Sequence, residues 1–168
     1  TACSIDPPSV RREILARPRG EQSAVYASAR YTPTPRLRTD FGLRWDRQSL
    51  APRGGSLLGP RLGVRYQLAA STYLNASWGR FFESQAIHEL QASDGVVSYF
   101  EPQEAEHLIV GFDHELANRV SLRVELYDKQ MSRLRPRFEN LINTLTLLPE
   151  LQPDRILVQP ASARARGV

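Results

Sequence analysis

Three histidines, His88, His107 and His114, are the first residues whose chemistry we considered. A metal site needs several ligands that converge on one point. His107 and His114 are separated by an odd number of positions, so one extended strand would place them on opposite faces, and His88 falls in a long polar segment. The single cysteine, Cys3, has no partner at metal-binding spacing. We therefore predict no metal site and no cofactor.

Ser77 and His107 are residue types that hydrolases use for nucleophilic catalysis. A serine nucleophile is normally marked by a sharp strand-to-helix turn flanked by glycines, and neither residue has such a context. The sequence therefore predicts no catalytic residue and no enzyme. A hydrolase remains a distant alternative, which loss of an activity on replacement of Ser77 would be needed to revive.

The segment GRFFESQAIHELQ combines aromatic rings with charged and amide groups directly after an alternating strand. Such a mixture at the mouth of a pore suits the capture of a small ligand. The alternative is a rim that stacks against neighbouring loops or against a plug. The predicted ligand-binding residues are Arg80, Phe81, Phe82, Glu83, Gln85, His88 and Glu89.

The formal net charge is +4, from 22 Lys and Arg against 18 Asp and Glu. The charges alternate in sign along strands, and no basic cluster is interleaved with aromatic residues, so we predict no nucleic-acid partner. The stretch RLRPRFEN holds a basic patch of Arg133, Arg135 and Arg137. On an outer loop this patch would attract either anionic ligands or the lipopolysaccharide of an outer leaflet, and we favour lipopolysaccharide.

The elements that must position these residues are strands. In LRTDFGLRWD, Leu37–Asp46, apolar or weakly polar residues alternate with charged residues and glycine, which predicts one oily and one wet face. We expect residues 1–20 to be a loop or connecting segment and residues 21–168 to be a partial barrel. The expected strands span about 23–31, 37–48, 61–68, 72–82, 104–116, 120–130 and 161–168.

The connections between these strands alternate between short and long, which is typical of outer-membrane barrels with short turns on one side and long loops on the other. No apolar run is long enough for a transmembrane helix. Ten residues at about 3.3 Å each, tilted by about 45°, rise roughly 23 Å, which suits the apolar band of such barrels. We predict an all-β fold, an antiparallel up-and-down transmembrane β-barrel segment of about six to seven strands of a larger barrel.

The two faces of the strands then receive different surroundings. We predict that the wet face lines a lumen through Arg38, Asp40, Arg44, Asp46, Arg65, Arg123 and Glu125. On the oily face, four aromatic residues fall near the strand ends, as interfacial girdles would, or else belong to a core. These lipid-interface aromatics are Tyr31, Trp45, Tyr66 and Trp78.

Several stretches together resemble the barrel of TonB-dependent outer-membrane receptors. They are RYTPTPRLRTDFGLRWDRQS, PRLGVRYQLAASTYLNASWGRFFESQAIHELQ, AEHLIVGFDHELANRVSLRVELYDKQMSRLRPRFEN and ASARARGV. The resemblance covers roughly residues 21–168 and implies a barrel of about 22 strands around an N-terminal plug. It also implies a TonB box that contacts the inner-membrane energising complex. Neither plug nor TonB box is visible in this sequence, so we expect a portion of the barrel.

The resemblance implies energy-coupled uptake of a scarce ligand across the bacterial outer membrane, with an iron chelate, cobalamin or an oligosaccharide as the ligand. The expected partners are outer-membrane lipid and lipopolysaccharide, the small-molecule ligand, and, through other parts of the protein, the plug and the TonB complex. One alternative is a passive porin-like or structural outer-membrane barrel. A second is a soluble β-sandwich binding module, which predicts that Leu37, Phe41 and Leu43 are buried in a core.

Overall fold

A computed structural model describes residues 17–51, 55–90, 96, 98–116, 120–140, 147 and 156–168. Most of the connecting segment expected at residues 1–20 lies outside this description, so that expectation stays a prediction. None of the described residues forms a helix long and apolar enough to cross a membrane.

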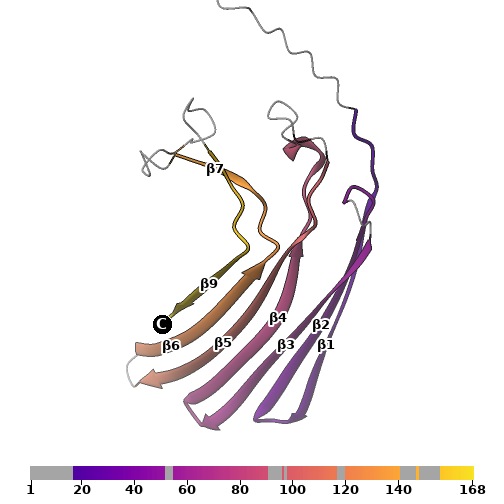
Figure 1. The fold of residues 1–168 in the computed structure, drawn as a ribbon. Coiled ribbons are helices and arrows are strands. Elements are labelled where there is room, and N and C mark those ends of the chain that lie inside the picture. The colour runs from indigo at the N-terminus through magenta and orange to yellow at the C-terminus, as the bar shows by residue number, and fades with distance from the viewer. Residues whose placement is uncertain are drawn as a thin grey trace, which may run out of the picture.

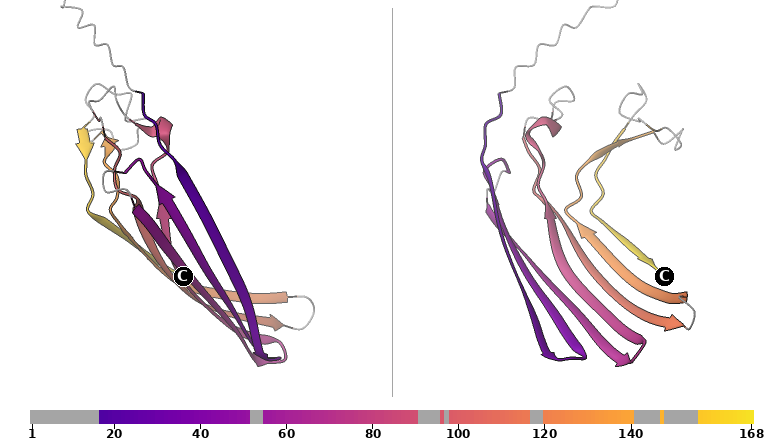
Figure 2. Two further views of the ribbon diagram at one scale, coloured as in Figure 1. Left: turned by 90° about the vertical axis from the view of Figure 1, so that its right-hand side faces the viewer. Right: turned by 180° about the vertical axis from the view of Figure 1, so that it is seen from behind.

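The fold is one antiparallel sheet of seven strands in the order β1-β2-β3-β4-β5-β6-β9. The strands are β1 (Gln22–Thr34), β2 (Leu37–Gln48), β3 (Gly55–Ala69), β4 (Thr72–Glu83), β5 (Gln103–Leu116), β6 (Val120–Ser132) and β9 (Ser162–Gly167). Each strand pairs with its neighbour in sequence, except that the small hairpin β7 (Arg137–Glu139) and β8 (Ile156–Val158) is inserted before β9. The sheet curves like a section of a cylinder wall (Figures 1 and 2). The prediction of an antiparallel, up-and-down, all-β barrel segment is confirmed.

Short and long connections lie at opposite ends of the sheet. Only Pro35 and Arg36 join β1 to β2, and only Ala70 and Ser71 join β3 to β4. These turns lie at the lower end in Figure 1, whereas the described parts of the connections 84–102 and 133–161 lie at the upper end. The first of these holds a one-turn 3₁₀ helix, η1 (Ile87–Glu89), and the second holds the β7-β8 hairpin.

β3 begins at Gly55, six residues before the Arg61 expected from the sequence. The glycine and proline content of this stretch suggested a loop, but its ladder with β2 continues to the pair Gln48 and Gly55. Gly59 is needed here because a Cβ at this position would lie 2.8 Å from the carbonyl oxygen of Arg80. The glycine that suggested a loop therefore permits a close approach of two strands.

The sheet has almost no hydrophobic core. Among the described residues, the buried apolar side chains are those of Ala51, Tyr99 and Pro102, and none of them lies within a strand of the sheet. Phe41 and Leu43 remain 48% and 46% exposed. The structure thus contradicts the β-sandwich alternative, which required these side chains to be buried against a second sheet. An apolar sheet face this extensive calls for a nonaqueous environment or a partner.

The apolar face forms a band that runs obliquely to the hydrogen-bonded rows of the sheet. Its upper edge lies at Trp45 in β2 and at Trp78 in β4. Trp45 pairs with Leu58 of β3, whereas Trp78 pairs with Leu62, which lies four residues further along β3 toward the short turns. In β6 the edge lies at Leu126, which pairs with Val110. From β2 to β6 the edge therefore descends by six residues over four strand steps, about 1.5 residues per strand, and a descent of about 5 Å over a strand spacing of about 4.8 Å corresponds to a strand tilt of about 45°. Tilted barrel strands in a flat membrane require such an offset.

Candidate ligand-binding hollow

The face opposite the apolar band is crossed by ion pairs. Asp40 binds two arginines, Arg30 at 2.6 Å and Arg38 at 3.2 Å, and Asp113 lies 3.4 Å from Arg123. The seven residues predicted to line a lumen all belong to this face and all take part in such pairs: Arg38, Asp40, Arg44, Asp46, Arg65, Arg123 and Glu125. Because these side chains are partly exposed, the pairs organise the face more than they stabilise it. That the face lines the lumen of a closed barrel stays a prediction.

A hollow of about 390 Å³ opens on this polar face and spans β1 to β5. Its floor is built from the small residues Gly42, Gly63, Ser77 and Gly79, which lie on neighbouring strands. Small residues on a concave sheet face leave space that larger side chains would fill. The volume falls in the range of pockets that take small organic ligands.

Phe81 forms the upper wall of the hollow together with Arg61 and His107. The Arg61 guanidinium lies 4.6 Å from the centre of the Phe81 ring, and the His107 ring lies 4.8 Å from it. Gly79, which pairs with both Arg61 and His107, holds this cluster together because a Cβ there would lie 3.0 Å from the Phe81 ring. The Nε2 atom of His107 is buried and makes no hydrogen bond. The cluster thus offers a ring face, a guanidinium and an unpaired imidazole nitrogen.

The structure separates the residues that the sequence grouped at the mouth. Phe81 faces the hollow, whereas Arg80 and Phe82 belong to the opposite face. Arg80 there binds Glu104 at 3.1 Å, and the Arg133 guanidinium lies 5.8 Å from the centre of the Phe82 ring. Only Phe81 of these three is placed to meet a ligand in the hollow.

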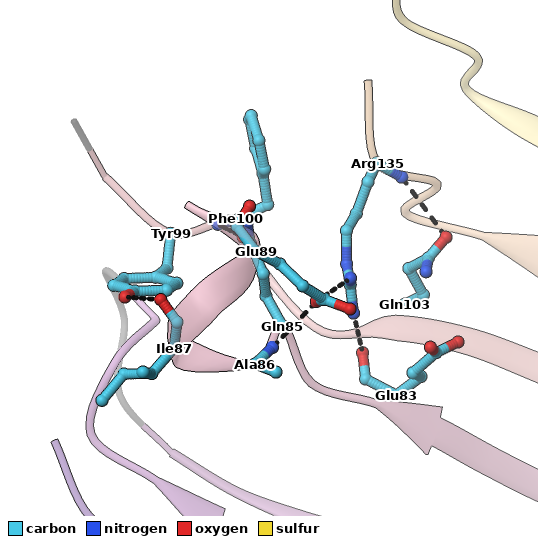
Figure 3. A network of polar contacts seen from close by, with 9 residues as sticks. All are labelled: Glu83, Gln85, Ala86, Ile87, Glu89, Tyr99, Phe100, Gln103 and Arg135. Atoms are coloured by element: carbon cyan, nitrogen blue, oxygen red, sulfur yellow. Dashed lines mark hydrogen bonds and ion pairs between the residues drawn. The ribbon is translucent and has the colours of Figure 1, made fainter. Parts of the chain in front are cut away.

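Four predicted mouth residues remain, and they lie in or beside the connection 84–102: Glu83, Gln85, His88 and Glu89. Much of the described part of this connection is held by hydrogen bonds within the chain (Figure 3). Gln85 is buried, accepts a hydrogen bond from the Phe100 backbone and donates one to the Glu89 carbonyl oxygen. His88 is exposed on η1. These contacts give Gln85 a role in shaping the loop, and a role in ligand contact stays a prediction.

Glu89 and Arg135 join the two long connections. The Glu89 carboxylate accepts hydrogen bonds from the Ala86 backbone at 2.8 Å and from Arg135 at 2.7 Å. Arg135 also donates to the Glu83 carbonyl oxygen at 3.3 Å (Figure 3). The Ala86 hydrogen bond, and after it the Arg135 charge, hold the pKa of Glu89 below its usual value.

The three arginines of the predicted basic patch are each engaged within the chain. Arg135 is tied to the first long connection and its side chain is only 16% exposed. Arg133 binds Glu104, and Arg137 binds Glu139 at 2.5 Å. The Arg137 side chain nevertheless remains 68% exposed, so a contact of this patch with an anionic partner stays a prediction.

The four predicted interfacial aromatics share the apolar face. Trp45 and Trp78 lie toward the long connections, and Tyr31 and Tyr66 lie toward the short turns. Trp78 donates its indole N–H to Glu106 at 2.7 Å. A ring with one apolar side and one bound polar end suits an interface, and contact with lipid stays a prediction.

Ser77 and His107 both line the hollow, but the buried Nε2 atom of His107 has no hydrogen-bond partner, so it does not bind Ser77. Within the described ranges, no group of three or more His, Cys, Asp or Glu side chains is arranged to hold a metal ion. Sequence reasoning considered His107 only for metal binding and catalysis, and it missed Arg61 as a neighbour of Phe81. Both residues pair with Gly79, so the signal was the register of three strands, which a single sequence does not supply.

The curved sheet, the oblique apolar band and the ion-paired opposite face define a section of a β-barrel wall. Comparison with protein families matches residues 5–168 to the family described as TonB dependent receptor-like, beta-barrel. The chain belongs to this family. The family is one of outer-membrane receptors and transporters, not of enzymes.

A solved structure of the receptor FpvA of P. aeruginosa, bound to heterologous pyoverdines in a complex with iron, is similar in fold. The TM-score is 0.53 at 21% sequence identity, and the match covers 88% of this chain. It covers only 19% of the FpvA chain, so this sequence corresponds to a small part of such a receptor. Comparison with curated proteins gives no match.

Proposed function

We propose that this chain forms part of the barrel wall of a receptor that takes up a scarce ligand across the bacterial outer membrane, with energy supplied through a TonB complex. The observation that carries the proposal is the oblique apolar band, since a tilted strand needs this offset only where a flat apolar layer surrounds the sheet. Membership of the receptor family supports the same conclusion.

In this proposal the two faces have separate tasks. The apolar face contacts lipid, with Trp45, Trp78, Tyr31 and Tyr66 at its two borders. The polar face lines the lumen, where the hollow beside Phe81 contacts either the ligand or the plug. Iron chelates, cobalamin and oligosaccharides are the ligand classes to test.

The orientation is tested first with spin labels at the adjacent residues Leu43 and Arg44, in the whole protein reconstituted in lipid. Oxygen, which dissolves in lipid, should relax the label at Leu43, and a water-soluble nickel chelate should relax the label at Arg44. If both labels respond to nickel, or neither responds to either reagent, the lipid-facing assignment is wrong.

Uptake is tested with radiolabelled members of the three ligand classes in cells that carry the protein. Energy-coupled import predicts that a proton uncoupler abolishes accumulation. The passive porin alternative predicts equilibration that the uncoupler leaves unchanged.

A role of the hollow is tested by Phe81→Ala, with Phe82→Ala as its control, because these neighbours are identical in type and lie on opposite faces. Equal uptake by both variants would remove the hollow from the proposal.

A further inference from the structure

Two cations lie in one row of the polar face, on either side of the hollow's Phe81 wall. Arg61 of β3 pairs with Gly79 of β4, which in turn pairs with His107 of β5. His107 pairs with Lys129 of β6. The strands β3 to β6 each have a neighbour on both sides in the sheet, so this row lies within the wall and away from its open edges.

The neighbours of these two cations differ from those of other cations on the polar face. Arg38, Arg65 and Arg123 each form an ion pair with an aspartate. Within the part of the chain that the structure describes, neither Arg61 nor Lys129 forms an ion pair. We call Arg61 and Lys129 the unpaired cations. Their charge is not neutralised by a described carboxylate, unlike that of the arginines around them.

The register explains why Arg61 is unpaired. Its partners on the two neighbouring strands are both glycines, Gly42 and Gly79, where a carboxylate would otherwise be able to face it. Its guanidinium lies 4.6 Å from the centre of the Phe81 ring, a contact that leaves the N–H donors free. The same two glycines belong to the floor of the hollow. The guanidinium is therefore open to a molecule that enters the hollow.

Lys129 borders a second hollow of about 280 Å³, which shares Phe81 and His107 with the first. Two carboxylates line this second hollow. Glu104 is bound by arginines outside it. Glu83 lies four positions along β4 from the row of the unpaired cations, about 13 Å toward the long connections at about 3.3 Å per residue. The surroundings of Lys129 therefore add to the positive potential beside Phe81.

We propose that Arg61 binds the acidic group of a small planar molecule in the hollow, with Lys129 adding attraction from the other side of Phe81. A guanidinium binds a carboxylate through strong, charge-assisted hydrogen bonds. The planar part lies on the floor, because glycines project no side chain into the hollow. This inference rests on the proposed function, in which the hollow meets the ligand. It narrows the ligand to one with a free acidic group, which a neutral oligosaccharide lacks.

The test compares two probes that share a ring and differ in charge, para-fluorobenzoate and para-fluorobenzamide. Their binding to the whole protein in detergent micelles is measured by fluorine NMR. The wild type should bind the benzoate about tenfold more tightly than the benzamide, since a hydrogen bond to a charged group contributes about this factor. Arg61→Gln should bind both probes equally. Lys129→Gln should weaken benzoate binding about threefold, as expected for a more distant charge.

Arg65→Gln is the matched control for Arg61→Gln. Arg65 lies on the same strand and the same face, and its guanidinium also lies over a ring, 4.2 Å from the centre of Tyr73. It differs from Arg61 because Asp113 pairs with it. Arg65→Gln should therefore keep the preference of the wild type for the benzoate.

A second experiment supplies a carboxylate from within the chain. A Cβ at Gly42 would lie 3.5 Å from the Cβ of Arg61, an ordinary contact, so aspartate and asparagine are both accommodated there. Gly42→Asp should neutralise Arg61 and weaken benzoate binding about tenfold relative to Gly42→Asn. The two variants should bind the benzamide equally. Because aspartate and asparagine have the same size, a difference between them reports charge and not lost space or impaired folding.

Three results would each overturn the proposal. The first is equal affinity of the wild type for the two probes, because the unpaired cations would then be neutralised by another part of the whole protein. The second is a preference for the benzoate that survives in Arg61→Gln. The third is equal weakening of benzoate binding in Gly42→Asp and Gly42→Asn.

Failure of this inference and failure of the proposed function give different results. If Leu43 faces lipid and a proton uncoupler abolishes uptake while the wild type shows no preference for the benzoate, only the acidic-ligand site is wrong. If Leu43 faces water, the proposed function fails whatever the two probes show.

Discussion

Arginine substitutions at the neighbours Ala76 and Ser77 compare the surroundings of the two sheet faces, because the two positions differ in little except the face on which they lie. Both residues lie in the middle of β4, both are small and both are exposed in the structure, so neither substitution meets a steric obstacle in the sheet. Ala76 lies between Leu74 and Trp78 on the apolar face, whereas Ser77 lies on the floor of the hollow. Any difference in stability therefore reports the surroundings of each face.

An arginine on the lipid face near the bilayer midplane costs about 2–4 kcal/mol of folding free energy. Ala76→Arg should lower the free energy of unfolding by this amount, a factor of about 30 to 1,000 in the folding equilibrium constant. Ser77→Arg should change it by about 0.5 kcal/mol or less, as for a surface position, because the hollow is open to water. The assay is equilibrium unfolding of the whole protein in urea with lipid vesicles, followed by tryptophan fluorescence.

Equal losses in the two variants would refute the reasoning, because faces in the same environment penalise arginine equally. A larger loss for Ser77→Arg would reverse the face assignment. Repeating both measurements with leucine supplies the control. Leucine is larger than alanine but apolar, so Ala76→Leu should leave the free energy of unfolding in lipid unchanged or raise it. If Ala76→Leu lowers the free energy of unfolding as Ala76→Arg does, the loss follows side-chain size and counts against a lipid environment.

Two further predictions concern the hollow and the loops. Gly79→Ala should push the Phe81 ring from its place, since a Cβ would lie 3.0 Å from the ring, and should cost about 1–2 kcal/mol in the same urea assay. The lowered pKa of Glu89 means that its contribution to loop order is complete above the ordinary value of 4.5 and is lost as the pH falls through the lower folded-state pKa. Hydrogen exchange of the Ala86 amide should therefore accelerate as the pH falls through the pKa of Glu89. Arg135→Gln should shift this acceleration to higher pH. An acceleration at the same pH in the variant would contradict the assigned role of the ion pair.

The strands and their faces were predictable because alternation is a local property. The period of two in Leu37–Asp46 reflects the pleat itself, and the structure gives β2 as Leu37–Gln48. The long connections were predictable for a similar reason, since glycine, proline and polar residues interrupt the alternation. The early start of β3 was missed because Gly55, Gly59 and Pro60 carry the same composition as a loop.

The candidate site was less predictable because it depends on register. The sequence placed Arg80, Phe81 and Phe82 together, although alternation alone already puts Phe81 on the face opposite to its neighbours. Arg61 and His107 are far apart in sequence and meet only because both pair with Gly79. Long-range partners such as Glu89 and Arg135 leave no local signal at all.

The oblique band also bears on how such a wall can change size during evolution. Its edge descends by about 1.5 residues for each added strand, so each two-stranded hairpin carries its own share of the offset. A duplicated hairpin inserted beside its parent would extend the sheet without rotating the strands already present. The descent per strand would then act as a module boundary, which allows the circumference to grow by whole hairpins while the thickness of the layer crossed stays constant.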